Sequence, residues 1–556
     1  MKIKNKISIK SKGLLILSFL LAIVQIAFSQ DIKKDVTVVK PYQPSILDVS
    51  KINLLPAFND TISLFPKFDY SISTVHLNTT FQPRIISAAK MAPEPLQYLY
   101  NNYIKLGLGN RLATLAELSI ASNRSKKNSY GIYFKHKSAD GLVKLDNDKR
   151  VDAPFADNAL TFYGRQIFKE SVLSGNVGYL SNKVAFYGYH PSLDTTLFKN
   201  NILQYYRGGN INLSLESLET DSAHLYYKFS GGYNYLSDNF KNAENHISFK
   251  GQGGKQYNDY YLGAELQYDN FSPGANNDST HNTVFSIKPY LSKSKGDWRF
   301  HIGIDATEDN TEKGGNFYPY LIANLEFAIV RSVLNAYIGY DGFLEINNLA
   351  TIAGINPFIV PGLRITNTNH KIHIFGGLKG SANSNIYYSC QASYSAIDDQ
   401  YFFVNDTILP YNKFTAVYDN IELLQFSAEF DIKASEKLSL LARGNYQVYS
   451  MSHESIKPWQ MPNIDATLTL KYNMQDKIIL TADICTFGRR YARDPITRQA
   501  NLMNPFFDFN LGIEYHYTKI LSLFLQFKNL TATRYLIWDQ YPAYRFQVMA
   551  GLTYAL

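Results

Sequence analysis

The sequence predicts an all-β fold, a transmembrane antiparallel β-barrel of about 22 strands that follows a short extended N-terminal periplasmic arm. Three observations support this prediction. Apolar and polar residues alternate in segment after segment from residue 102 to Leu556, and the connections between these segments are alternately short and long. Tyrosine is also frequent, with 42 residues in a chain of 556. Strands with one lipid-facing side alternate in this way, and tyrosine rings suit the two membrane interfaces.

The composition excludes several other classes of protein. With 45% hydrophobic and 14% aromatic residues, the chain has too much apolar surface to remain disordered. Beyond residue 30 no stretch reaches the ~18 to 20 apolar residues that a membrane-spanning helix needs, and the nearest candidate carries Glu326 and Arg331 in its middle. Two cysteines are too few for a disulfide framework. A soluble β-sandwich is the remaining alternative, and it would need two apolar inner faces and protected sheet edges.

Residues 1–29 are a predicted secretory signal peptide. The first twelve residues contain five lysines and no acid: Lys2, Lys4, Lys6, Lys10 and Lys12. The stretch from Leu14 to Phe28 is almost wholly apolar, and Ala27 and Ser29 are small residues at the positions that a signal peptidase reads. Cleavage before Gln30 removes five of the 55 Lys and Arg residues and none of the 47 acids, which leaves a net charge of about +3. Binding to nucleic acid therefore loses its main support.

Residues 30–101 form the predicted periplasmic arm. Seven prolines interrupt it: Pro41, Pro44, Pro56, Pro66, Pro83, Pro93 and Pro95. No helical period survives this spacing, because each residue before a proline is pushed towards extended conformations. We expect an extended segment with a few short strands and no large core of its own.

Residues 102–556 form the predicted barrel. In 507–517, for example, the odd positions are apolar and the even positions are polar or glycine. Marking every such segment gives 22 strands, centred near residues 106, 117, 133, 162, 178, 210, 230, 248, 264, 288, 303, 322, 339, 375, 391, 427, 443, 468, 483, 511, 527 and 550. The long connections expected between them include 139–156, 347–369, 398–420, 451–461 and 491–505. Because the strand number is even, both ends lie on the short-turn side, which is the periplasm in the outer membrane of a Gram-negative bacterium.

The C-terminal strands resemble a known family. The residues that carry the resemblance are Asn529, Leu530, Tyr535, Trp538, Tyr541, Pro542, Arg545, Phe546 and Gly551 to Tyr554. They are similar to the C-terminal end of TonB-dependent receptors, whose barrels have 22 strands. The resemblance implies a barrel-insertion signal read by the insertion machinery, at Tyr544, Phe546, Gly551, Leu552, Tyr554 and Leu556. The sequence pattern predicts a terminal strand with Tyr544, Phe546, Val548, Ala550, Leu552, Tyr554 and Leu556 on one face. Leu556 stands where the family more often ends in Phe.

The resemblance covers only the barrel. Receptors of this family carry a plug domain of well over a hundred residues, whereas only the arm precedes the first predicted strand here. A stretch of the arm looks like the box with which such receptors contact TonB: Asp35, Val36, Thr37, Val38 and Val39. We expect that a lumen of this width must be filled, by the arm or by another protein, because an open one would breach the membrane.

No pattern of catalytic, cofactor-binding or metal-ligating residues stands out. The sequence contains no phosphate-binding loop, zinc-protease motif or nucleophile elbow, and a strand would place His370 and His373 on opposite faces. We therefore expect no enzyme activity, no cofactor and no metal. The charged loop 146–157 suits solvent, with calcium or surface sugar as the alternative. The aromatic residues of 398–420 suit either a partner or the lumen: Tyr401, Phe402, Phe403 and Tyr411.

Two functions remain open. The first is a receptor or transporter that takes up a solute across the outer membrane. The second is a structural subunit of an outer-membrane assembly or export complex that transports nothing itself. Expected partners are outer-membrane lipid, the barrel-insertion machinery and a periplasmic or surface lipoprotein docked through the arm. We also expect Cys390 to face lipid and Cys485 the lumen, so that no disulfide joins them.

Overall fold

The computed structural model describes residues 101–122, 125–193, 203–218, 225–274, 281–311, 314–453 and 456–556. The predicted signal peptide, the arm up to residue 100 and the TonB-box-like residues Asp35 to Val39 lie outside these residues. Within the described part of the chain, no helix has the length and apolar character needed to cross a membrane.

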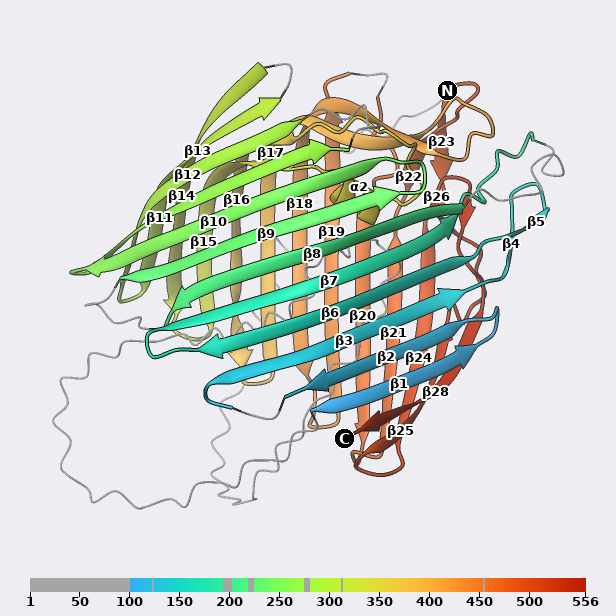
Figure 1. The fold of residues 1–556 in the computed structure, drawn as a ribbon, viewed down its shortest axis with the longest axis horizontal. Helices are drawn as coiled ribbons and strands as arrows, with labels where there is room; N and C mark the ends of the chain where they lie inside the picture. The colour runs from blue at the N-terminus through green and yellow to red at the C-terminus, as the bar shows by residue number, and fades with distance from the viewer. Residues whose placement is uncertain are drawn as a thin grey trace, which may run out of the picture. The chain divides into compact units, whose positions relative to one another are not determined.

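One antiparallel sheet of 22 strands forms the wall (Figure 1). Its strands are β1 (Asn102–Gly109), β2 (Thr114–Ala121), β3 (Asn128–Ala139), β6 (Phe155–Ile167), β7 (Ser171–Ala185), β8 (Leu203–Ser217), β9 (Tyr226–Asp238), β10 (Ala243–Tyr257), β11 (Tyr260–Pro273), β12 (Asn282–Lys295), β13 (Trp298–Thr311), β14 (Gly314–Val330), β15 (Leu334–Glu345), β16 (Thr368–Asn383), β17 (Ile386–Asn405), β18 (Phe414–Lys433), β19 (Leu438–Met451), β20 (Ile464–Met474), β21 (Ile478–Phe487), β24 (Phe506–His516), β25 (Leu521–Lys528) and β28 (Gln547–Ala555). Every predicted strand centre falls inside one of them. The predicted fold class is confirmed.

The sheet closes on itself, which leaves it without an edge. β28 pairs with both β25 and β1, and the last register runs from Tyr103 opposite Ala555 to Gly109 opposite Met549. Closure satisfies the backbone amides and carbonyls within the wall, as a hydrocarbon environment requires.

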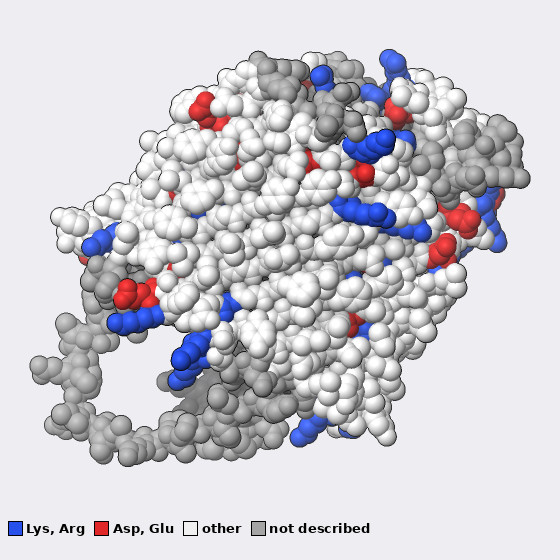
Figure 2. Space-filling model, viewed as in Figure 1, with Lys and Arg blue, Asp and Glu red and all other residues white. Residues whose placement is uncertain are grey.

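The two faces of the wall differ as the alternation predicts. Along β13, Ile302 and Ile304 are about half exposed on the outer face, whereas Asp305 and Thr307 are buried on the inner face. Lys288 of β12 lies 2.8 Å from the Asp305 carboxylate. Figure 2 shows charged side chains mainly towards the ends of the strands, with few across the wall between them. An apolar outer band over a polar interior is the arrangement of a membrane barrel.

The longest connections all lie at one end of the barrel, which also has a few short turns such as β1–β2, and most connections at the other end are short. β24 and β25 are joined by 517–520 on the short-turn side, as predicted. Several long connections carry small elements of their own: β4 (Leu142–Lys144), β5 (Arg150–Asp152), α2 (Leu349–Ile355), β22 (Arg490–Arg493), β23 (Ala500–Met503), β26 (Leu536–Trp538) and β27 (Tyr541–Pro542). Long connections face the cell exterior in outer-membrane barrels, so this end is the outer mouth.

One predicted loop is wrong. The sequence pattern predicts a long irregular connection at 398–420, but β17 continues to Asn405 and β18 begins at Phe414, so the connection is only 406–413. Tyr401, Phe402 and Phe403 belong to β17 and are buried rather than presented on an exposed loop.

The two cysteines face opposite sides of the wall, as predicted. Cys390 lies opposite Leu378, which is 42% exposed on the outer face. Cys485 is buried and lies opposite Asp508, which is also buried. No disulfide joins Cys390 to Cys485.

Candidate functional site

Four connections at the outer mouth pack together into what we call the loop cap. They are the described part of the β7–β8 connection (186–193), the β15–β16 connection with α2 (346–367), the β17–β18 connection (406–413) and the β25–β28 connection (529–546). Side chains of the first, second and fourth of these connections share one apolar cluster with the upper ends of the wall: Val184, Phe186, Tyr206, Leu236, Leu349, Ile352, Ala353, Phe358, Ile359, Leu363, Tyr401, Phe403, Phe414 and Tyr541. The loops thus form a core inside the barrel end, where Figure 1 shows α2.

Tyr541 lies at the centre of the loop cap and is fully buried. Its ring lies 3.9 Å from that of Phe358 and 4.9 Å from that of Tyr187, and its hydroxyl donates to the Asn412 carbonyl. A Cβ atom on Gly188 would lie 2.5 Å from Tyr541 Cε2, so only glycine fits there. One side chain therefore links all four connections.

The helix α2 is fixed by polar contacts at its start. The Asn348 side chain caps it by accepting from the Thr351 amide at 2.7 Å. The Leu349 amide donates to a carboxylate oxygen of Glu244, on wall strand β10, at 3.1 Å. Just beyond the helix, Tyr206 of β8 donates to the Pro357 carbonyl at 3.1 Å. These bonds hold α2 against the inner wall and set the position of Phe358.

Beside this core lies a polar cavity of about 430 Å³. Its charged and polar lining comes from four loops: Asp146, His190, Asp494, Asn501, Thr533, Arg534, Asp539 and Gln540. Phe506 and Tyr535 form an apolar part of the lining, with stacked rings 4.1 Å apart. Within the described part of the chain, this is where charged groups converge in the outer mouth.

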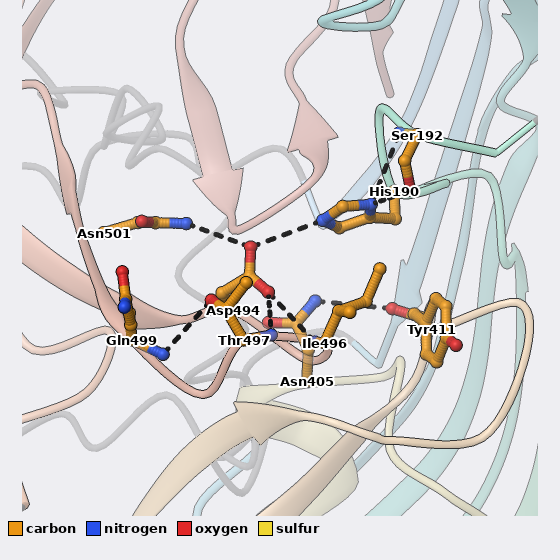
Figure 3. Close-up of polar contacts among 9 residues, drawn as sticks. All are labelled: His190, Ser192, Asn405, Tyr411, Asp494, Ile496, Thr497, Gln499 and Asn501. Atoms are coloured by element: carbon orange, nitrogen blue, oxygen red, sulfur yellow. Dashed lines mark hydrogen bonds and ion pairs between the residues drawn. The ribbon is translucent and has the colours of Figure 1, made fainter.

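Asp494 is the most constrained carboxylate of the cavity (Figure 3). Its Oδ1 accepts from the amides of Ile496 and Thr497 at 2.9 and 2.8 Å, and its Oδ2 lies 3.4 Å from His190 Nε2. Burial alone would raise the pKa of Asp494, but the two amides and His190 outweigh it and lower that pKa below its usual value. Asp494 therefore stays ionised. The other ring nitrogen of His190 lies 2.7 Å from Ser192 Oγ.

Asp539 is held differently. Burial, with repulsion from Asp146 and Asp494, raises the pKa of Asp539 to about 7. The nearby Arg490 is buried, and its guanidinium donates to the carbonyls of Leu536 and Ile537, each at 2.6 Å. Arg490 thereby fixes β26 and the turn that presents Asp539.

The cavity suits a polar solute with hydrogen-bond donors or positive charge. Arg534 lies 2.5 Å from Asp146 and offsets that carboxylate, so the remaining negative charge is that of Asp494, which also bonds to His190, and that of Asp539 when it is ionised. Both amide atoms of Gln540, which is 5% exposed, lack a hydrogen-bond partner within the described chain. Buried amides are normally paired, so Gln540 has donor and acceptor capacity left for water or a guest. The described residues contain no cluster of three or more His, Cys, Asp or Glu side chains that could hold a metal ion.

The predicted insertion-signal residues fall into two groups. Gly551, Leu552 and Tyr554 lie in β28, Leu556 follows it, and Leu552 and Leu556 are exposed on the outer face. Tyr544 and Phe546 instead precede β28, which begins at Gln547. The Tyr544 hydroxyl donates to the Ala153 carbonyl at 2.5 Å, so this residue belongs to the loops and not to the terminal strand in which the sequence pattern places it.

Other predicted residues are also placed. Asp146, from the charged loop 146–157, lines the cavity. His373 bonds to Asp341 at 2.8 Å and His370 to Glu345 at 3.1 Å, so each has a carboxylate partner. Sequence reasoning missed His190, Asp494 and Asp539. No signal could have joined them, because they come from three connections, one of them about three hundred residues from the other two.

Comparison with known proteins identifies the fold. No family model matches the sequence, and no curated protein matches it either. The structure is similar to the ferric-catecholate import receptor Fiu of E. coli K12 (10% identity, 82% of both chains, TM-score 0.61). It is similar to the FrpB iron transporter of Neisseria meningitidis (8% identity, 83% of this chain and 82% of that one, TM-score 0.65). A third similar structure is the copper transporter OprC (11% identity, 82% and 80%, TM-score 0.62).

At such low identity the likeness shows the fold alone. The chain has the 22-strand barrel of TonB-dependent receptors, as its C-terminal residues indicated, and this architecture places it in the outer membrane of a Gram-negative bacterium. The structural neighbours are receptors and transporters.

Proposed function

We propose that the protein is an outer-membrane receptor or transporter that takes up a small polar solute. The solute binds in the polar cavity beside the loop cap, which we call the cap cavity. The solute's hydrogen-bond donors or positive charge face Asp494 and Asp539. It is not an enzyme, and the TonB-box-like stretch from Asp35 to Val39 couples uptake to the inner membrane.

The observation that carries this proposal is the cavity itself. Four separate loops bring ionisable and amide groups together at the outer mouth, over a lumen lined by polar side chains. Ligand sites are concave, partly apolar and lined by a few convergent polar groups. A solute that displaces the loop cap would gain access to the lumen, which is how binding at this end serves uptake.

A depletion experiment tests the proposal with the solute still unidentified. Cells lacking the chain are complemented with the wild type, with Asp494→Asn or with the matched control Asp297→Asn, which alters a partly exposed turn carboxylate, paired with Arg331, at the short-turn end. Mass spectrometry then follows the loss of amine-containing and polyhydroxyl compounds from a defined medium. We expect at least one compound to be depleted by wild-type and Asp297→Asn cells, and more slowly by Asp494→Asn cells.

If no compound depends on the chain for depletion, uptake is refuted. The alternative of a structural subunit predicts instead that stable assembly or export factors co-purify with the chain and that their levels fall in the deletion strain. Affinity purification from mild detergent distinguishes the two.

A further inference from the structure

A second hollow, of about 710 Å³, lies at the outer end near the seam where β1 meets β28. The β1–β2 turn, the loop that carries β4 and β5, and the β25–β28 connection line it. Its charged lining is strongly basic, with five cationic side chains and two carboxylates: Arg111, Lys144, Arg150, Arg534 and Arg545 against Asp140 and Asp152.

Part of this positive charge is not neutralised. Lys144 is paired with Asp148 and Arg534 with Asp146, which leaves Arg111, Arg150 and Arg545. Arg111 donates to the Leu142 carbonyl at 2.9 Å, and Arg545 donates to the Ala532 carbonyl at 2.7 Å. Bonds to carbonyls orient a guanidinium group and leave its charge available. Within the described chain, neither of these residues nor Arg150 forms an ion pair with a carboxylate, and Arg111 Nε has no partner. Oriented guanidinium groups with spare donors match the oxygens of a phosphate.

Apolar side chains flank the basic hollow. Leu112 and Leu142 line it and are 77% and 48% exposed. Leu108, on the outer face of β1, is 72% exposed. If only water covered this surface, exposure of the leucine side chains would cost free energy. Acyl chains below a charged headgroup would cover both kinds of side chain.

The turn that presents Arg111 and Leu112 has an unfavourable conformation. Arg111 and Leu112 have φ values of 58° and 51°, and the Gly109 amide donates to the Ala113 carbonyl at 2.8 Å. Such a hairpin turn prefers Asn-Gly, because other residues are strained in the left-handed region. The turn therefore carries two large side chains where Asn-Gly would be less strained.

The hollow also lies at the level of the lipid headgroups. β1 and β2 have eight residues each and β28 has nine, about the length of tilted strand that crosses the hydrocarbon core. The turn at 110–113 therefore leaves the wall where the outer interface begins, beside the projecting β4 and β5 (Figure 1).

We propose that this hollow binds the phosphorylated headgroup of an outer-leaflet lipid. Arg111, Arg150 and Arg545 contact the phosphate, and Leu108, Leu112 and Leu142 contact the acyl chains. The inference is independent of the proposed uptake function, since the cap cavity and this hollow take different ligands.

Binding of a short-chain lipid to the purified full chain in detergent tests the inference. The probe is dioctanoyl phosphatidic acid, compared with dioctanoylglycerol, which lacks the phosphate, and with inorganic phosphate, which lacks the chains. We expect the phosphatidic acid to bind at least about tenfold more tightly than either, the effect of one charge-assisted contact. Equal binding of dioctanoylglycerol would reduce the site to an apolar patch, and equal binding of phosphate would make it a site for the free ion. Either result, or no binding, overturns the proposal.

Two variants assign the binding to the hollow. The double variant R111N/L112G gives the turn its preferred Asn-Gly sequence, so it should be at least as thermally stable as the wild type and yet bind at least about tenfold more weakly. R150Q/R545Q should weaken binding similarly with the turn unchanged. K519Q, in an exposed turn at the opposite end, should bind as the wild type does. Wild-type affinity in both double variants would refute the assignment.

Discussion

The rings of Tyr541 and Phe358 stack with their centroids 3.9 Å apart and their planes inclined by 24°. The two residues belong to connections nearly two hundred residues apart, and their contact joins the β25–β28 loop to the segment after α2. Aromatic pairs of this kind stabilise by more than the area they bury. Loops thus pack on one another at the outer mouth, and this packing depends on a few buried rings.

Replacing Tyr541 with Ala should open the loop cap and leave the barrel intact. Removal of a fully buried aromatic ring typically destabilises by about 3–5 kcal/mol, and here the loss falls on the cap and not on the wall. We expect faster hydrogen exchange in α2 and in β26–β27, and higher single-channel conductance in planar bilayers. Tyr541→Phe, which removes only the hydroxyl, is the control and should resemble the wild type. Unchanged exchange in Tyr541→Ala would show that the cap does not depend on this ring.

The stability of the cap should fall as the pH rises from about 4 to about 7. The pKa of Asp539 is about 7 in the folded cap, above the usual ~3.9 of an unfolded aspartate, so the folded form holds more protons between these values. Stability gained from the protonated carboxyl is therefore complete near pH 4 and lost by about pH 7. Asp146, Asp494 and Arg490 face this group and set the size of the effect.

Hydrogen exchange of β26–β27 at pH 5 and pH 8, corrected for intrinsic rates, measures this dependence. Asp539→Asn should make the corrected rates nearly equal at the two pH values. A wild-type cap that is more protected at pH 8 than at pH 5 would contradict the assignment to Asp539.

Arg490 should prove more important for its shape than for its charge. Removal of the Arg490 side chain would leave the carbonyls of Leu536 and Ile537 without their partner. Each unpaired buried carbonyl typically destabilises by roughly 1–3 kcal/mol. Arg490→Lys keeps the charge but cannot make both bonds in the same geometry. We expect both Arg490→Ala and Arg490→Lys to increase exchange in β26, with Arg443→Lys, in wall strand β19, as a control without effect. Full protection in Arg490→Lys would refute the role of the planar group.

The wall could be predicted from sequence because the membrane imposes a local rule. Each strand must put apolar residues on alternate positions, as Ile302 and Ile304 do on β13, and neighbours far away in sequence are not needed to read this. The alternation is lost where strands extend beyond the membrane into the loop cap. Tyr401 and Phe403 pack in the loop cap, whereas Phe402 and Val404 pack on the other face with Trp459. Because both faces of this part of β17 are covered, its sequence does not alternate between apolar and polar residues. The pattern that identifies the other strands is therefore missing there.

The cavity could not be predicted for a different reason. His190 and Asp494 meet only because the cap folds across the mouth, and their bond joins residues 304 apart. The width of the lumen predicts that it must be closed, but nothing in the sequence indicates that the loops supply the closure. Loop packing of this kind follows from tertiary contacts such as that of Gly188 with Tyr541, which leave no periodic signal.

The two cysteines should differ in labelling. Cys390 is partly exposed on the lipid face, whereas Cys485 is buried on the inner side. A lipid-soluble maleimide should therefore modify Cys390 in membranes and leave Cys485 unmodified, which peptide mass spectrometry detects. Cys390→Ser is the control and should show no modification. A crosslink between the two residues in the non-reduced protein would overturn the assignment of faces.

Deletion of residues 30–101 should remove a bound protein and leave conductance near that of the wild type. The seven prolines predict an extended arm, which would suit either threading of the lumen or docking of a periplasmic partner. The loop cap already packs around Tyr541 at the outer mouth, so we expect the membrane barrier not to require the arm as well. We therefore expect the deletion to strip a co-purifying lipoprotein while Tyr541→Ala alone raises conductance. Combining both changes should give the conductance of Tyr541→Ala. A rise in conductance on deletion of the arm alone, with sensitivity to large antibiotics, would show that the arm is a plug.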